Sequence, residues 1–407
     1  NRQARHTESY MRLAAKHGLY VIPWSYPRVA QPMGMIKPKE LKALPLTETL
    51  KARAMAEGDN LPLPDRLKIR RALYEEQEPA TVADTKILRT YRNLIAYYGQ
   101  DEPNLLNPKD RIASAEWYWK TVAGLDLYRP KILVYAKHIP NGENWTRWAD
   151  ILAYDVYPGP PYRGGAFHSE PGLSTAYYAY KLRERCRRDN KIMWFVPLAS
   201  MLDPGRTPIG MGKDHMLCQA YAAIIYGARG LMYFALANVV GPEAWDGLRV
   251  ICRQVKEMAP AILNGDIPQE IRYTPDHFQP LERKFPAVNV AVFQYPGGDH
   301  LLMAVNVTAF AVDASLKVDG LKGAARLFSN GGNGTLAIDH ESLSDRIEPY
   351  GGRAYRLRLA DAPGPVRVAL NMTRVADERA VTVDIPGIAR QVMMSKNHMP
   401  NPCLTQQ

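Results

Sequence analysis

The chain has 407 residues, of which 46% are hydrophobic, and it carries 52 Lys and Arg against 41 Asp and Glu, a net charge of +11. This length is enough for one large domain and one smaller one. No apolar run approaches the ~18 to 20 residues of a membrane-spanning helix, which excludes that class. The positive charge suits an anionic partner, such as an acidic polysaccharide or an envelope surface. Its densest stretches, 66–71 and 181–191, fit solvated helix faces better than a binding patch.

The cysteines and the short motifs argue against a metal or cofactor protein. Cys186, Cys218, Cys252 and Cys403 lie far apart and form no C-x-x-C pair, which predicts buried thiols rather than a zinc site or a disulfide framework. The sequence has no metal-ligand spacing, phosphate-binding loop or dinucleotide fingerprint. We therefore expect no metal, no cofactor and no nucleic-acid partner.

Six apolar runs predict strands in the first two-thirds of the chain. They cover residues 19–24, 94–103, 131–137, 150–158, 191–200 and 230–236. Segments with helical spacing separate them, and this alternation is typical of a parallel sheet covered by helices.

The helix over 248–263 leads directly into a β-rich region, so the six runs are best counted as strands three to eight of a (β/α)8 barrel over 1–265. We expect strands one and two to come from another segment or chain, since two missing strands would expose two edges. A long insertion, 25–83, is expected to lie over the carboxyl ends of the strands.

Beyond residue 265 the apolar pattern has period two. Alternating runs separated by turn residues over 266–392 predict a C-terminal β-sandwich. Residues 393–407 show no period and are expected to form an irregular tail.

The run Leu94–Pro103, LIAYYGQDEP, is the strongest candidate for a functional site. An aromatic strand ends there in Asp101 and Glu102, and Pro103 stops the ladder. A (β/α)8 barrel presents its catalytic acids in this way, at the carboxyl ends of its strands. The alternative is an acidic turn that opens the next helix, because Asp and Glu favour helix N-termini.

The order of the strand-end motifs resembles that of a known enzyme class. DEP closes the fourth strand, DVYP the sixth, and YGARGLMYF leads into the eighth. Together they resemble distant (β/α)8 glycoside hydrolases of the clan with its acid/base on strand four, and EPYGGRAYRLRL is similar to part of their C-terminal β-domain. The resemblance implies that Glu102 is the general acid/base and that Asp155 and Tyr157 face the sugar.

One departure from that family concerns the second carboxylate. Its retaining members carry a nucleophilic Glu at the tip of strand seven, where this chain has residues 197–200, PLAS. Hydrolysis ordinarily needs two carboxyl groups. Asp155 is the best placed, because it ends a strand, whereas helix caps or loops explain the other candidates, which are Asp203, Asp214 and Glu243.

Further residues at the predicted strand ends suit substrate binding, by stacking on sugar rings or by hydrogen bonding. A role in filling the core explains Tyr98 and Trp194 as well as sugar binding does. A lone histidine such as His138 is more often structural. The predicted set is Asp101, Trp24, Tyr98, His138, Tyr157, Trp194, Ser200 and Tyr233.

Three hypotheses follow for the function. The first is a secreted or envelope-associated glycoside hydrolase that acts on a poly- or oligosaccharide. The second is a glycosidase-like barrel that has lost its chemistry and serves as a carbohydrate-binding or assembly component, which the absence of a carboxylate over 197–200 favours. The third is another barrel enzyme, such as a lyase or transferase. The fold alone does not separate them.

Overall fold

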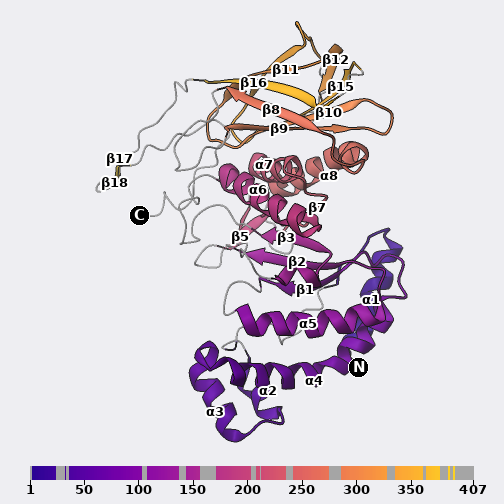
Figure 1. Cartoon of the computed structure of the whole chain (residues 1–407), viewed down its shortest axis with the longest axis vertical. Coiled ribbons are helices and arrows are strands. Elements are labelled where there is room, and N and C mark those ends of the chain that lie inside the picture. The colour runs from indigo at the N-terminus through magenta and orange to yellow at the C-terminus, as the bar shows by residue number, and fades with distance from the viewer. Residues whose placement is uncertain are drawn as a thin grey trace. The chain divides into compact units, whose positions relative to one another are not determined.

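The computed structural model describes residues 2–23, 33, 36–102, 108–136, 144–155, 171–202, 208–210, 212–234, 242–274, 286–327, 335–360, 364–375, 384–385 and 388–389. The chain divides into two compact units: residues 1–155 with 184–194, and residues 156–183 with 195–407. The first unit is built on a parallel sheet, and the second contains the antiparallel sheets (Figure 1).

The parallel sheet of the first unit follows the chain order. Its strands are β1 (Tyr97–Asp101), β2 (Lys131–Ala136), β3 (Ile151–Asp155) and β4 (Ile192–Phe195), each paired in parallel with the next. Val21 adds a parallel bridge to Leu94, just before β1. Every residue of β2 and β3 is buried, as expected for strands covered on both faces. The predicted parallel sheet is therefore confirmed.

The helices of the first unit are α1 (Arg2–Lys16), α2 (Pro38–Ala43), α3 (Glu48–Glu57), α4 (Leu63–Leu88) and α5 (Pro108–Leu125). The 26-residue α4 runs beside α5 and leads into β1 (Figure 1). Residues 63–83 of the insertion predicted over 25–83 belong to this helix, and the position of the insertion over the carboxyl ends of the strands stays a prediction. Pro64 sits in the first turn, where its missing N–H costs nothing, and α4 accommodates Pro79 in its interior.

The predicted solvated face over 66–71 is also wrong in part. Arg66 is buried and donates to the carbonyl of Asp59 at 3.0 Å, and Arg70 is fully buried. In the second basic stretch, 181–191, Arg185 is buried and pairs with Asp189. These guanidinium groups hold local structure together, which a count of charges does not reveal.

Gly99 interrupts the regular pairing of β1. The register against β2 shifts between Tyr98 and Gln100, which marks a bulge at Gly99. A Cβ at this position would overlap the indole of Trp119 and the ring of Tyr118 on α5. Glycine is required here because α5 packs directly on the strand backbone.

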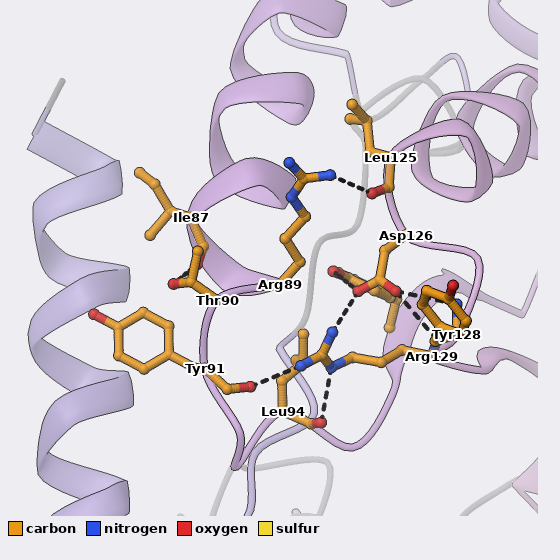
Figure 2. Close-up of polar contacts among 10 residues, drawn as sticks. Ile87, Arg89, Thr90, Tyr91, Leu94, Leu125, Asp126, Tyr128 and Arg129 are labelled. Atoms are coloured by element: carbon orange, nitrogen blue, oxygen red, sulfur yellow. Dashed lines mark hydrogen bonds and ion pairs between the residues drawn. The ribbon is translucent and has the colours of Figure 1, made fainter.

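Asp126 organises the loop between α5 and β2 (Figure 2). Its side chain is almost fully buried and accepts hydrogen bonds from the Tyr97 hydroxyl at 3.0 Å and from Nη1 of Arg129 at 2.7 Å. Arg129 in turn donates to the carbonyl oxygens of Leu94 and Tyr91. This cluster connects the amino end of β1 to the turn before β2. It lies at the amino edge of the parallel sheet, where residues typically contribute to stability.

Two opposing effects set the pKa of Asp126. Burial raises it, but hydrogen bonds from Arg129 and Tyr97, together with the Arg129 charge, lower it by more, so the net pKa lies below the ordinary value of 3.8. The carboxylate therefore stabilises the folded state above the ordinary pKa, and this contribution is lost as the pH falls through the lower folded-state pKa.

We expect Asp126→Asn to lower the free energy of unfolding by about 1.5–3 kcal/mol at pH 7, because the buried side chain loses its charge-assisted hydrogen bond with the partly exposed guanidinium of Arg129. The difference from the parent should shrink as the pH falls through the lowered folded-state pKa and the parent carboxylate becomes protonated. Urea unfolding at pH 7 and at the lowest pH at which the protein stays folded measures this. Glu8→Gln, which removes the exposed ion pair with Arg12, is the control and should change stability by less than about 0.5 kcal/mol. An equal loss at both pH values would contradict the charge effect.

The second unit has parallel pairing of its own and further helices. The N–H groups of Met232 and Phe234 donate to the carbonyls of Phe195 and Pro197, so the runs at 191–200 and 230–236 are parallel neighbours. The elements here are α6 (Pro171–Asp189, its first thirteen residues in this unit), β7 (Gly230–Leu231), α7 (Lys213–Ile225) and α8 (Pro242–Ile262). All six predicted runs thus enter parallel pairing, while closure into a barrel stays a prediction.

Two antiparallel sheets follow within the second unit. One has the order β13-β12-β15-β10-β9 and the other β14-β11-β16-β8, where β8 and β16 pair in parallel. Side chains of both sheets share one apolar core, which includes Val292, Leu302, Leu316 and Leu370. The strands are β8 (Gln269–Thr274), β9 (Val288–Gln294), β10 (His300–Asn306), β11 (Val312–Val318), β12 (Leu321–Leu327), β13 (Thr335–Leu336), β14 (Ser342–Ile347), β15 (Gly352–Leu359) and β16 (Val366–Arg374).

Two further pairs, β17 (Asp384–Ile385) with β18 (Ile388–Ala389), and β5 (Ser200–Leu202) with β6 (Pro208–Gly210), are short antiparallel hairpins. The predicted tail over 393–407 lies outside the described residues. Within the described ranges, no helix combines the length and apolar character needed to cross a membrane.

The cysteines differ in exposure. Cys186 and Cys218 are buried as predicted, but Cys252 is exposed, which corrects the prediction for that residue. Cys403 lies outside the described residues. Burial, and then the Asp189 charge, raise the pKa of Cys186 to about 12, and burial raises that of Cys218 further.

Because the thiolate is the reactive form, we expect a maleimide at pH 7.5 to modify Cys252 rapidly, and Cys186 and Cys218 only after unfolding in urea. Mass spectrometry of tryptic peptides measures the three positions separately. Modification of Cys218 in the native protein at the rate of Cys252 would contradict its burial.

Candidate functional site

Glu102 follows directly on the last residue of β1. Its backbone N–H donates to the carbonyl of Val134 on β2 at 3.0 Å, so its main chain is fixed to the sheet. Its φ is +42°, in the left-handed region that non-glycine residues rarely adopt, and the side chain is half-buried. Such strain, held by the surrounding structure, is typical of functional sites.

Asp155 is the last residue of β3 and is only 6% exposed. It pairs in register with Ala136, while Asp101 pairs with Val134 one strand over. Glu102 and Asp155 therefore leave the same edge of the sheet with β2 between them. Two strand spacings put their backbones about 10 Å apart.

The bulge and the strained backbone both affect where the Glu102 side chain lies. Residues of a regular strand alternate between the two faces of the sheet, but the register shift at Gly99 and the positive φ of Glu102 both break this alternation. The direction of the Glu102 carboxylate is therefore set by local backbone geometry and not by the period of the strand.

Four of the predicted substrate-binding residues, besides Asp101, lie in described segments: Tyr98, Trp194, Ser200 and Tyr233. Tyr98 on β1 and Trp194 on β4 are half-buried. Tyr233 is half-buried, and its hydroxyl donates to the carbonyl of Met216 on α7 at 3.0 Å, which anchors the segment after β7. Ser200 opens β5 and pairs with Gly210. Asp101 ends β1, and its side chain lies outside the described residues, as do Trp24, His138 and Tyr157 entirely.

Three other carboxylates, Asp203, Asp214 and Glu243, are candidates for the second carboxyl group, and the two in described segments lie where a helix N-terminus accounts for them. Asp214 lies in the first turn of α7, where burial raises its pKa and the charges of Lys213 and Arg353 lower it in part. Glu243 lies in the first turn of α8, and Asp203 falls outside the described residues. A carboxylate in a first helical turn is stabilised by the helix dipole without any catalytic role.

Residues 197–200, predicted to end strand seven and termed the strand-seven segment, are fixed by contacts with α7. Leu198 and Ala199 are buried, and the Gln219 side chain on α7 hydrogen-bonds both backbone groups of Leu198, accepting from its N–H at 2.9 Å and donating to its carbonyl at 3.3 Å. No carboxylate occupies residues 197–200. In the described part of the chain, no three His, Cys, Asp or Glu side chains converge as a metal site would require.

The sequence interpretation missed a polar and aromatic surface on the outside of the first unit. It combines Tyr74 and Glu78 of α4 with Trp117 and Thr121 of α5. The spacing of Trp117, Thr121 and Gly124 (i, i+4, i+7) was the available signal, because it places the three on one stripe of the helix.

Comparison with known proteins gives likeness of fold only. No family model and no curated protein matches the chain. Among solved structures it is similar to the α-amylase of Geobacillus thermoleovorans in complex with acarbose, at 11% identity over 88% of this chain and 81% of that one, with a TM-score of 0.49. It is similar to a family GH27 β-L-arabinopyranosidase of Geobacillus stearothermophilus at 13% identity over 71% of this chain, with a TM-score of 0.44.

The α-galactosidase I of Mortierella vinacea matches at 9% identity over 70% of this chain and 72% of that one, with a TM-score of 0.44. The chain spans only 63% of the length of the arabinopyranosidase. At such low identity the likeness concerns the fold alone, and no activity of this chain follows from it.

The strain at Glu102 can be measured through stability. We expect Glu102→Gly to be more stable than Glu102→Ala by about 1 kcal/mol, since both lack the carboxylate and only glycine adopts a positive φ without a steric penalty. His340, with a φ of +45° and a side chain 96% exposed, is the matched control, and its Gly and Ala variants should differ by a similar amount. Thermal unfolding measures all four. Equal stability of the two Glu102 variants would contradict backbone strain there.

Proposed function

We propose that this chain is a glycoside hydrolase that cleaves a poly- or oligosaccharide, with Glu102 as the general acid and Asp155 as the second carboxyl group. The observation that supports this best is the position of the two residues. Each stands at the carboxyl end of a strand of one parallel sheet, with a single strand between them, and Glu102 is held in a strained backbone conformation.

In this mechanism the Glu102 carboxylic acid donates its proton to the glycosidic oxygen as the bond to the anomeric carbon breaks. In a retaining reaction Asp155 attacks that carbon as the bond breaks, and the Glu102 carboxylate then deprotonates a water molecule that hydrolyses the glycosyl ester. In an inverting reaction Asp155 instead deprotonates a water molecule that attacks the carbon directly, and the separation of the carboxyl groups decides between the two. A retaining enzyme needs about 5 to 5.5 Å and an inverting one about 6.5 to 9.5 Å. Backbones about 10 Å apart allow either, because both side chains extend from the sheet edge.

A second candidate function is carbohydrate binding without cleavage. The strand-seven segment supports it, because it carries no carboxylate and its residues Leu198 and Ala199 are buried. In this case the aromatic residues near the sheet edge hold the sugar, and Glu102 and Asp155 accept hydrogen bonds from its hydroxyl groups.

Substitution of the two carboxylates distinguishes the two functions. We expect Glu102→Gln to lower the rate of hydrolysis by about 10²–10⁴, the usual contribution of a general acid, and to leave the melting temperature nearly unchanged. Asp155→Asn should lower it at least as much. Reducing-end release from a panel of neutral and acidic polysaccharides measures the rates.

Asp150→Asn is the matched control, since Asp150 directly precedes β3 at the opposite, amino end and bonds the backbone N–H of Lys131. It should leave hydrolysis unchanged. If the parent binds a polysaccharide of the panel but cleaves none, the binding function replaces the catalytic one. Activity that survives both carboxylate substitutions would overturn the assignment of these residues.

A further inference from the structure

A groove lies on the outer surface of the first unit between α4 and α5. Figure 1 shows the two helices running side by side. The groove between them is open to solvent, with a volume of about 490 Å³. One stripe of α4 contributes Arg71, Tyr74, Glu78 and Val82, and α5 contributes Trp117, Lys120, Thr121, Gly124 and Leu125.

The floor of the groove is a fixed hydrogen-bonded network. The Tyr74 hydroxyl contacts Oε1 of Glu78 at 2.9 Å, the carbonyl of Trp117 at 3.1 Å and the hydroxyl of Thr121. Thr121 also donates to Oε1 of Glu78 at 3.2 Å. Tyr74 is 5% exposed, and burial, the largest effect, raises its pKa, so it stays a neutral donor. The groove is therefore preorganised by contacts that both helices share.

Several polar groups of the lining keep hydrogen-bonding capacity for a ligand. The Nε of Arg71 bonds Glu75 at 2.7 Å, and its two terminal nitrogens have no protein acceptor among the described residues. Oε2 of Glu78 and the indole N–H of Trp117 likewise have no partner in the described part of the chain. The groove thus offers cationic and neutral donors and one anionic acceptor, and its two cations, Arg71 and Lys120, also form ion pairs with Glu75 and Glu116.

The aromatic groups add an apolar surface beside these polar ones. The Tyr74 and Trp117 rings lie 5.6 Å apart, and the Arg71 guanidinium lies over both, at 5.6 and 5.2 Å from their centroids. Stacking on aromatic rings holds the guanidinium in place without using its terminal N–H groups. Gly124 leaves the α5 side open, because a Cβ there would meet no atom within 4 Å.

This combination fits one ligand chemistry. Ring hydroxyls of a sugar donate to a carboxylate such as Glu78, the C–H face of a sugar packs on aromatic and aliphatic side chains, and a single carboxylate pairs with a guanidinium fork. A doubly charged phosphate would be repelled by Glu78. Glu75 engages only Nε of Arg71, so the two terminal nitrogens can still pair with a single carboxylate of the ligand, which a neutral sugar does not supply.

We propose that the α4–α5 groove is a binding site for an acidic oligosaccharide with hexuronate units, separate from the carboxylates at the sheet edge. Arg71 pairs with the uronate carboxylate, Glu78 accepts from a ring hydroxyl, and Trp117 carries the sugar face. The site binds saccharide without cleaving it, and its existence does not depend on the catalytic function proposed for Glu102.

Calorimetric titration with trigalacturonate tests this site, with maltotriose as the neutral probe. We expect the full chain to bind trigalacturonate and not maltotriose, and the affinity to fall as NaCl rises from 20 to 300 mM. Gly124→Trp should abolish binding by filling the groove, whereas Gly124→Ala, the matched control, should leave it unchanged. Arg71→Gln should weaken binding roughly tenfold, through loss of a charge-assisted hydrogen bond.

Glu102→Gln separates this proposal from the catalytic one, because a ligand held in the groove should bind that variant with unchanged affinity. Circular dichroism tests whether the Gly124→Trp variant is folded. If it is not folded, Trp117→Ala, which is also expected to lose binding, tests the groove instead. The proposal is overturned if trigalacturonate fails to bind, if maltotriose binds equally well, or if a folded Gly124→Trp or Trp117→Ala variant keeps the parent affinity.

Discussion

Parallel pairing is the constraint on which the first unit depends. Successive strands run in one direction, so each connection must cross back along the outside, and all strands end at one edge. Glu102 and Asp155 are neighbours at that edge for this reason alone, although 53 positions separate them in the sequence. The opposite edge carries the buried Asp126 and Arg129 cluster. The carboxyl edge therefore presents the two candidate carboxylates, and the amino edge carries contacts that hold the sheet to its loops.

The strands could be predicted from sequence because burial on both faces requires continuous apolar runs, as in 131–136 and 151–155. The length of α4 could not, since its prolines and charges are typical of a loop and its stability comes from packing against α5. The burial of Arg70 and the bulge at Gly99 were likewise invisible, because both depend on which distant groups pack against them. Local sequence patterns therefore predict the strands, whereas the length of α4, the burial of Arg70 and the bulge at Gly99 depend on tertiary contacts.

For the candidate site, the sequence placed Glu102 and Asp155 at strand ends, and the structure agrees on this position. The direction of their side chains is a different matter, because a positive φ breaks the alternation on which such a prediction rests. For the groove residues, the spacing on each helix could be read from the sequence, but the pairing of the helices could not. Two stripes form a groove only when the helices lie side by side. In addition, an outward aromatic residue such as Trp117 is easily taken for a core residue.

The close approach of α5 to β1 has a consequence for how this chain can change over time. Gly99 has no side chain because the Trp119 indole and the Tyr118 ring occupy the space that a Cβ would need. A methyl group at position 99 becomes tolerable only after positions 118 and 119 have made room for it, so these sites can change only together and in one order. Between those two steps the chain would carry a cavity beneath the strand that presents Glu102. The backbone next to Glu102 is thus protected from gradual substitution by aromatic residues of α5 that pack against Gly99.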